Sequence, residues 1–147
     1  MLAKYENDRK ELIMRALIAE DDLASRKFIL KILEPFGDCD FTVNGVETLD
    51  AFLLALDELK PYDLICLDIM MPRLDGIKAL KAIRDIEKQT VIEEEKKVKI
   101  IMTTALNSKE IVLNAYDSGC EAYAYKPIET DKFIIVMKKL GLIASEE

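Results

Sequence analysis

The stretch LICLDIMMPRLDG spans residues 64–76 and places a carboxylate, Asp68, directly after four apolar residues. An apolar run of this length is typical of a buried β-strand. A charge at the end of such a strand loses hydration that the apolar neighbours do not replace. The sequence therefore predicts that a bound cation or other polar groups of the chain stabilise the charge of Asp68.

Four further apolar runs have strand length, and the segments between the runs have apolar residues at helical spacing. The predicted strands are residues 16–19, 41–43, 64–67, 98–102 and 122–125. The predicted helices are residues 23–36, 46–59, 76–87, 109–118 and 131–140. Strict alternation of apolar strands with helices predicts a parallel sheet that is covered on both faces.

Five βα units of this size fit a doubly wound, flavodoxin-like (βα)5 fold, which is a three-layer α/β sandwich with strand order 2-1-3-4-5. In such sheets the ligand site lies at the carboxyl ends of the strands, where the order reverses between strands 1 and 3. We expect residues 15–141 to form this domain. Residues 1–14 are then an N-terminal extension, and residues 142–147 are a C-terminal tail.

The chain has 147 residues, of which half are hydrophobic, and a net charge of −7. This length is typical of one domain, and the negative charge argues against a nucleic-acid surface. No apolar run approaches the roughly 18 residues of a membrane-spanning helix. Residues 1–14 carry charges where a signal peptide has its apolar centre. We therefore expect a cytoplasmic protein without a nucleic-acid or membrane partner.

The three cysteines, Cys39, Cys66 and Cys120, are widely spaced, and the chain contains no histidine. This pattern argues against a disulfide framework and against a zinc site. We expect the cysteines to be small buried hydrophobic residues. Without imidazole, any chemistry must use carboxylates, hydroxyls, lysines or a bound ion.

Polar residues gather where four of the predicted strands end. They are Glu20, Asp21 and Asp22 after the first strand, Asp68 after the third, Thr103 and Thr104 after the fourth, and Lys126 after the fifth. Gathered carboxylates repel one another, so the cluster predicts a bound cation. Oxygen ligands without imidazole favour Mg²⁺, with Mn²⁺ as an alternative. A lysine and a threonine hydroxyl would complete a site for a phosphoryl group.

The pieces LIAEDD, LDIMMPRLDG, MTTA and YAYKPI follow one another in this order over about residues 15–141. In these pieces the chain resembles the CheY-like receiver domain of two-component response regulators. We expect a single-domain receiver, or a fragment of a longer regulator. The resemblance implies a phosphorelay signalling switch that accepts a phosphoryl group on Asp68. The donor would be a sensor histidine kinase, a phosphotransfer protein or a small phosphodonor. The chain would not be an enzyme beyond catalysing its own phosphorylation and dephosphorylation.

The resemblance also assigns a metal site. Glu20, Asp21 and Asp68 would bind Mg²⁺ together with the backbone carbonyl of Met70, and Glu20 would bind directly or through water. Asp22 is better explained as the cap of the helix that follows it. Asp75 could be a second catalytic carboxylate, but a cap for the helix after it is favoured.

The remaining roles concern the phosphoryl contacts and the switch. Thr104 and Lys126 would contact the phosphoryl oxygens, and Thr104 is preferred to Thr103 because it directly precedes an alanine, as in the family. Tyr123 would be the aromatic switch residue that acts with Thr104, and Tyr125 is the alternative on the same strand face. The peptide bond between Lys126 and Pro127 resembles the family's cis peptide.

Two apolar positions, Met70 and Leu106, lie two residues beyond Asp68 and Thr104. In the family these positions flank the approach of water to the phosphoryl group. Neither side chain can orient water, so the sequence predicts slow hydrolysis of the phosphoryl group. The charged run at residues 87–99 is interpreted as a solvated extension of the third helix and a loop.

Signalling is expected through the face formed by the fourth helix, fifth strand and fifth helix, which is the usual output surface of the family. Its partner is an unknown output protein, and the same face could form a homodimer. Two alternatives remain open. One is a Mg²⁺-dependent phosphohydrolase that forms an aspartyl phosphate, although it would want an acid at Met70. The other is a protein-binding scaffold that is not phosphorylated.

Overall fold

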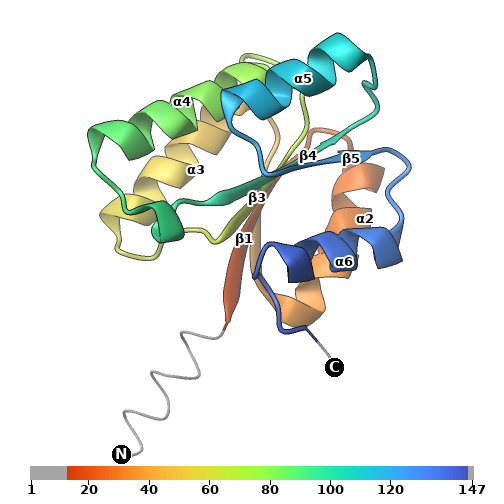
Figure 1. The fold of residues 1–147 in the computed structure, drawn as a ribbon, viewed down its shortest axis with the longest axis horizontal. Helices are drawn as coiled ribbons and strands as arrows, with labels where there is room; N and C mark the ends of the chain where they lie inside the picture. The colour runs from red at the N-terminus through yellow and green to blue at the C-terminus, as the bar shows by residue number, and fades with distance from the viewer. Residues whose placement is uncertain (1–12, 146–147) are drawn as a thin grey trace, which may run out of the picture.

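The computed structural model describes residues 13–145 and contains five parallel strands in the order β2-β1-β3-β4-β5 (Figure 1). The strands are β1 Met14–Ala19, β2 Gly37–Thr42, β3 Leu64–Leu67, β4 Lys99–Thr104 and β5 Ala122–Tyr125. The helices are α2 Leu23–Leu33, α3 Gly45–Asp57, α4 Gly76–Gln89, α5 Lys109–Ser118 and α6 Thr130–Lys139, with 3₁₀ turns at Glu34–Phe36 and Glu94–Lys96. The predicted doubly wound fold and its strand order are confirmed.

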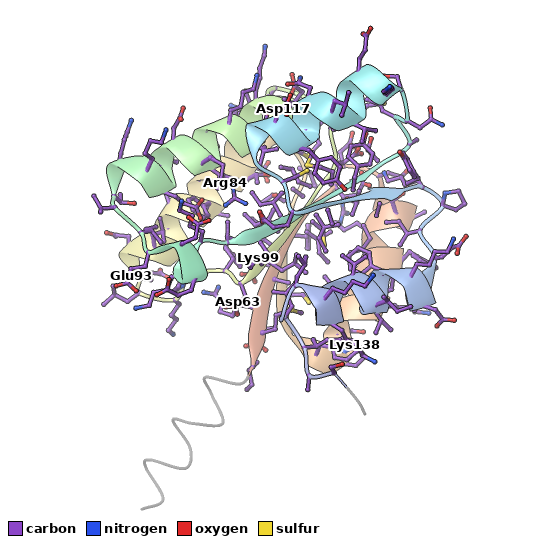
Figure 2. All side chains as sticks on the ribbon, in the orientation of Figure 1. Asp63, Arg84, Glu93, Lys99, Asp117 and Lys138 are labelled. Carbon is purple, nitrogen blue, oxygen red and sulfur yellow. The ribbon has the colours of Figure 1, made fainter. Side chains whose placement is uncertain are left out.

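The helices form one layer on each face of the sheet. Helices α3, α4 and α5 cover one face, and α2 and α6 cover the other (Figure 1). Side chains fill both spaces between sheet and helices (Figure 2). Because successive strand residues point to opposite faces, β3 contributes Ile65 and Leu67 to the first core and Leu64 and Cys66 to the second. The sheet is thus buried on both faces, and its strand ends are held rigidly.

Each of four helices begins at a side chain that caps its first turn. The oxygen of the capping side chain accepts a hydrogen bond from the backbone N–H three residues later, which satisfies a donor that has no partner within the helix. The capping residues are Asp22 for α2, Asn44 for α3, Asp75 for α4 and Ser108 for α5. The cap interpretation of Asp22 and Asp75 is therefore confirmed.

Strand β2 differs from its prediction, since it begins at Gly37 and ends at Thr42 rather than spanning residues 41–43. It is an edge strand that pairs only with β1 among the described strands, so polar residues such as Asp38 and Asp40 face water. An apolar run therefore marks only the end of this strand. Cys39 on β2 is half-buried, whereas Cys66 and Cys120 are buried as expected.

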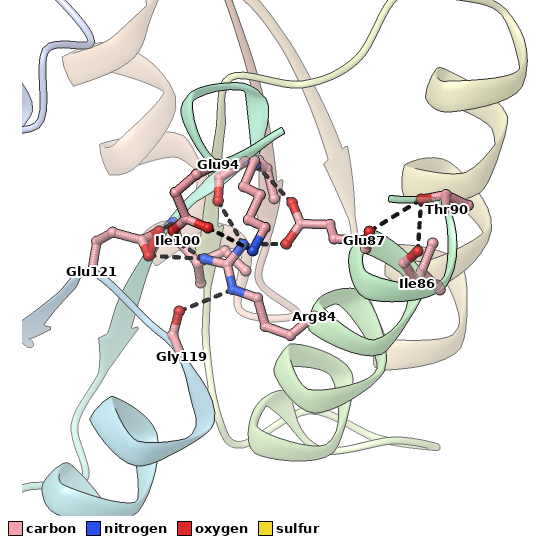
Figure 3. A network of polar contacts seen from close by, with 10 residues as sticks. Arg84, Ile86, Glu87, Thr90, Glu94, Ile100, Gly119 and Glu121 are labelled. Atoms are coloured by element: carbon pink, nitrogen blue, oxygen red, sulfur yellow. Dashed lines mark hydrogen bonds and ion pairs between the residues drawn. The ribbon is translucent and has the colours of Figure 1, made fainter. Parts of the chain in front are cut away.

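The run at residues 87–99 is not simply solvated, because Glu87 is buried. Its carboxylate accepts a hydrogen bond from Arg84 at 2.6 Å and one from the backbone N–H of Val98 at 2.8 Å (Figure 3). Arg84 also donates two bonds to Glu121, at 2.7 and 2.9 Å, and one to the carbonyl of Gly119 at 3.0 Å. This network joins α4, the start of β4 and the α5–β5 turn at the amino ends of the strands.

The described helices and strands begin and end near the ends of the predicted domain, residues 15–141, whose boundaries stay a prediction. Strand β1 begins at Met14, one residue before the predicted start, and residues 1–12 of the predicted extension lie outside the described residues. In the predicted tail, Leu142 and Ile143 pack against the core beneath α2 and α6. Between residues 13 and 145, no helix has both the length and the apolar character needed to cross a membrane.

Candidate functional site

The carboxyl ends of β1 and β3 bring Glu20 and Asp68 together. The two strands pair in parallel with Ala19 opposite Leu67, so the next residue of each strand leaves the sheet at the same edge. The backbone N–H of Asp68 donates to the carbonyl oxygen of Ala19 at 3.0 Å. This places the two carboxylates at the switch point where the sequence predicts a site.

Glu20, Asp21 and Asp68 form an acidic cluster. One carboxylate oxygen of each lies within 4.8 Å of those of the other two. Glu20 and Asp68 are buried, whereas Asp21 is exposed and opens the cluster to solvent. Three carboxylates this close repel one another strongly unless positive charge is nearby, and an all-oxygen set of this kind suits a hard divalent cation.

Lys126 supplies positive charge from the end of β5. Its ammonium group forms an ion pair with Glu20 and a second one with Asp68, where Nζ lies 3.2 Å from Oδ2. The Lys126–Pro127 peptide bond is cis, as predicted. Lys126 thus bridges the two buried carboxylates, Glu20 and Asp68.

The close packing of these charged side chains shifts their pKa values. Burial raises the pKa of Glu20 to about 7, and the nearby charge of Asp68 adds to the increase while the hydrogen bond from Lys126 opposes it. Burial alone would lower the pKa of Lys126, but the hydrogen bond that it donates to Glu20 and the charges of Asp68 and Glu20 outweigh burial and raise that pKa. The lysine is therefore held charged beside the two buried acids.

Backbone groups complete the surroundings of Asp68. The backbone N–H of Met70 donates to Oδ1 of Asp68 at 3.3 Å, while the Met70 side chain is 61% exposed. The loop then folds back, and a Cβ on Gly76 would lie 2.1 Å from the carbonyl oxygen of Asp68. Only glycine permits this approach, which explains the glycine that ends the LDG piece. The Met70 N–H contact could not be predicted from the sequence pattern.

The two threonines that end β4 differ in their contacts. The hydroxyl of Thr104 accepts a hydrogen bond from the backbone N–H of Leu106 at 3.3 Å, and no bond joins it to Asp68 in this structure. Thr103 is also fully buried, and its hydroxyl has no hydrogen-bond partner among residues 13–145. The structure thus gives the two hydroxyls separate environments on opposite faces of the strand.

Tyr123 lies partly buried on β5 beside α5. Its hydroxyl donates to the carbonyl oxygen of Leu106 at 2.7 Å, so two residues singled out from the sequence are in contact. The ring of Tyr125, which is 49% exposed, lies 5.3 Å from that of Tyr123. Tyr123 is therefore hydrogen-bonded to the loop that follows Thr104. The hydroxyl of Tyr125 makes no side-chain hydrogen bond within residues 13–145.

The face of α5, β5 and α6 carries exposed apolar side chains. They are Leu113, Tyr116, Tyr125 and Ile135. A cavity of about 460 Å³ lies between β5 and α6 and is lined in part by Ala124, Pro127 and Phe133. The exposed residues make this face suited to a protein partner, in line with the expectation for the output surface.

The comparison with protein families agrees with the fold and the site. The family model of the response regulator receiver domain matches residues 16–138, which is most of the chain. The chain therefore belongs to the response regulator receiver domain family, and it is a receiver domain of two-component phosphorelay signalling.

Individual relatives support the same assignment. The chemotaxis protein CheY of Listeria monocytogenes is 30% identical over 132 residues, which cover 86% of this chain and 98% of that protein. The hybrid signal transduction histidine kinase L of Dictyostelium discoideum is 31% identical over 139 residues. The matched region is 94% of this chain but only 8% of the kinase. The chain thus corresponds to a small part of such kinases and to nearly all of CheY.

A solved structure shows a related receiver domain with a partner. It is the co-crystal structure of the Saccharomyces cerevisiae histidine phosphotransfer signaling protein Ypd1 and the receiver domain of its downstream response regulator Ssk1. The TM-score is 0.74 at 28% identity, and the match covers 88% of this chain and 89% of that one.

Receiver domains are signalling switches rather than enzymes of the usual kind.

Proposed function

We propose that Asp68 is the phosphoryl acceptor of this receiver domain and that the switch depends on Mg²⁺. The observation that carries the proposal is that Asp68 lies 3.2 Å from the ammonium group of Lys126 and clusters with the carboxylates of Glu20 and Asp21. A buried nucleophilic carboxylate with one cationic neighbour and an opening to solvent suits the transfer of a phosphoryl group.

The donor set fits a divalent cation. Glu20, Asp21 and Asp68 would hold Mg²⁺, or Mn²⁺ in its place, with the backbone carbonyl of Met70 as a further ligand. When bound, the ion would neutralise charge on the transferring phosphoryl oxygens. The exposure of Asp21 leaves room for water ligands, which Mg²⁺ usually keeps.

The reaction then proceeds on the residues of the chain. A carboxylate oxygen of Asp68 attacks the phosphorus atom of a phosphohistidine or a small phosphodonor, and the bond from phosphorus to the donor's nitrogen or oxygen breaks. The bonding electrons leave with the donor, and an acyl phosphate forms on Asp68. Lys126 moves from pairing with the free carboxylate to pairing with a phosphoryl oxygen. No separate substrate is turned over, so the domain catalyses only its own phosphorylation and dephosphorylation.

The signal would pass from Asp68 to the face of α5, β5 and α6. The acyl phosphate adds charge and acceptor oxygens, toward which the hydroxyl of Thr104 can turn. That movement gives up its bond with the N–H of Leu106, whose carbonyl holds Tyr123. Thr104, Leu106 and Tyr123 therefore form a connected path from the site to the output face.

The partners follow from the same chemistry. The donor would be a sensor histidine kinase or a phosphotransfer protein, as in the yeast complex, where a related receiver domain is crystallised with such a protein. The exposed apolar residues of the α5, β5 and α6 face would bind an output protein or a second copy of this chain. A cytoplasmic location is part of the proposal because intracellular phosphodonors must reach Asp68.

Two other functions are weaker. A phosphohydrolase would need an acid near the nucleophile to protonate its leaving group, and Met70 offers none. In a scaffold that is not phosphorylated, the clustered carboxylates of Glu20, Asp21 and Asp68 would have no function.

The test is the intact mass of the protein after incubation with acetyl phosphate and Mg²⁺. We expect the gain of one phosphoryl group, its absence in Asp68→Asn, and its loss when EDTA replaces Mg²⁺. Asp75→Asn is the matched control, because that carboxylate caps α4 and should leave the gain intact. Rapid release of phosphate from many esters would favour a hydrolase, and no adduct with any donor would favour the scaffold.

A further inference from the structure

Arg26 lies on the first turns of α2, behind the acidic cluster, and it contacts the backbone of that cluster. Its Nη1 donates a hydrogen bond to the carbonyl oxygen of Glu20 at 2.9 Å. Its guanidinium carbon also lies 4.5 Å from the centre of the Phe41 ring on β2. The arginine therefore bridges α2, the end of β1 and the edge strand.

The Glu20 carbonyl belongs to the peptide group that leads into Asp21. The C=O of this peptide group accepts the hydrogen bond from Arg26, while the N–H of Glu20, which belongs to the preceding peptide group, donates to the carbonyl of Thr42 at 3.0 Å. Asp21 is exposed, and its side chain makes no hydrogen bond within residues 13–145. The backbone that carries the Asp21 carboxylate is thus held at the Glu20 carbonyl by Arg26.

Phe41 explains how Arg26 is itself held. The Phe41 ring is 59% exposed, and the Arg26 guanidinium lies over its face. A guanidinium over an aromatic face is attracted by the ring and loses little of its hydration. The stacked ring keeps the arginine extended toward Glu20, so that its hydrogen bond is ready before a cation arrives.

From these contacts we propose that Arg26, supported by Phe41, is a positioning residue for the cation site of the domain. It does not touch the ion or the phosphoryl group, and it acts by fixing the peptide group between Glu20 and Asp21. The proposal rests on the proposed function, because it assigns Glu20 and Asp21 to a Mg²⁺ site. If Arg26 acted only through its positive charge, it would repel the cation and weaken binding. Removing that charge would then strengthen cation binding.

The two roles of Arg26 predict opposite results. If Arg26 only contributes charge, then Arg26→Met should bind Mg²⁺ as tightly as wild type or more tightly. If it positions the peptide group, Arg26→Met should bind more weakly. Lys27→Met is the matched control, because the neighbouring lysine is exposed on the same helix and makes no contact with Glu20.

The experiment is a calorimetric titration of each variant with MgCl₂, without a phosphodonor. We expect the dissociation constant of Arg26→Met to rise about tenfold, that of Phe41→Leu to rise about threefold, and that of Lys27→Met to stay within twofold of wild type. Arg26→Lys should fall between Arg26→Met and wild type, because lysine keeps the charge but not the planar donor group.

A second measurement separates positioning from loss of structure. The rate of phosphorylation by acetyl phosphate should need more Mg²⁺ in Arg26→Met but reach the wild-type value at saturation. If Arg26→Met does not fold, then Phe41→Leu and Arg26→Lys must show the weaker binding. Equal affinity in Arg26→Met and Lys27→Met would overturn the role of Arg26. Failure of the wild type to bind Mg²⁺ would instead overturn the proposed function.

Discussion

The hydroxyl of Tyr123 donates a hydrogen bond to the carbonyl oxygen of Leu106 at 2.7 Å, which ties β5 to the loop that follows Thr104. The sequence indicates the two residues for separate reasons. Tyr123 is predicted to be the switch residue, and Leu106 is predicted to lie near the phosphoryl group. Because of this contact, a movement of the loop would displace Tyr123 on β5, which is part of the output face.

Tyr123→Phe should break this connection without disturbing the site. We expect the free energy of unfolding in urea to fall by about 1 kcal/mol, because the variant leaves the Leu106 carbonyl without its donor. The rate of phosphorylation of Asp68 should stay within about twofold of wild type, since the hydroxyl makes no contact with Asp68. Tyr125→Phe is the control, and equal losses in both variants would contradict the role of the bond.

Glu20→Gln should stabilise the metal-free protein and abolish its response to Mg²⁺. Burial raises the pKa of Glu20 to about 7 from an ordinary value of 4.5, so the folded state binds a proton more tightly than the unfolded state. For this group, stability is therefore present at low pH and is lost as the pH rises from about 4.5 to about 7. At pH 8 in EDTA we expect the variant to be more stable by about 2 kcal/mol.

The measurement is urea unfolding at pH 5, 6, 7 and 8, with EDTA or with Mg²⁺. In EDTA the wild type should lose more stability across this range than Glu20→Gln. Added Mg²⁺ should restore stability to the wild type by mass action but should leave the variant unchanged. Parallel pH profiles for the two proteins would show that Glu20 does not titrate in this range.

Thr103→Val should stabilise the protein, because the buried hydroxyl of Thr103 has no partner among the described residues and valine has nearly the same shape. We expect a gain of about 1 kcal/mol in the free energy of unfolding, with phosphorylation unchanged. Thr104→Val provides the contrast, since it removes the hydroxyl assigned to the phosphoryl group. A loss of stability in Thr103→Val would mean that its hydroxyl is hydrogen-bonded.

Val91→Gly should also stabilise the protein. Val91 lies two residues beyond the end of α4 with a φ of 53°, and the N–H of Ile92 donates to the carbonyl of Glu87 at 3.1 Å. This arrangement favours glycine, and a β-branched residue there is strained by about 1–2 kcal/mol. Part of that gain is offset by the flexibility of glycine in the unfolded chain, so we expect about 1 kcal/mol in thermal or urea unfolding.

Helix α5 supplies the opposite case. It ends at Gly119 with a φ of 112°, and a Cβ there would lie 3.0 Å from the side chain of Arg84. Gly119→Ala should therefore lower stability. If Val91→Gly and Gly119→Ala shifted the unfolding midpoint in the same direction, strain at these helix ends would not explain either effect.

These cases also show what the sequence can and cannot predict. The strand ends that carry Glu20, Asp68 and Lys126 were predicted because apolar runs and the parallel topology place them at one edge. Helix caps such as Asp22 were predicted because the capping residue and the N–H that donates to it are only three residues apart in the sequence. The burial of Glu87 was not predicted, since its partner Val98 lies eleven residues away and a charged run favours solvent. Arg26 was missed because its contacts with Glu20 and Phe41 exist only in the folded chain.

The lifetime of the phosphoryl group should depend on Met70. Its backbone N–H contacts Asp68, and its exposed side chain can neither donate nor accept a strong hydrogen bond, so it cannot orient an attacking water. Met70→Asn should speed hydrolysis by about tenfold, the rate effect of about 1.4 kcal/mol that one added hydrogen bond can supply. The decay of the phosphorylated mass after removal of acetyl phosphate measures this rate. Met70→Leu keeps the position apolar and should decay like wild type, so equal decay in the asparagine and leucine variants would exclude a role for this side chain.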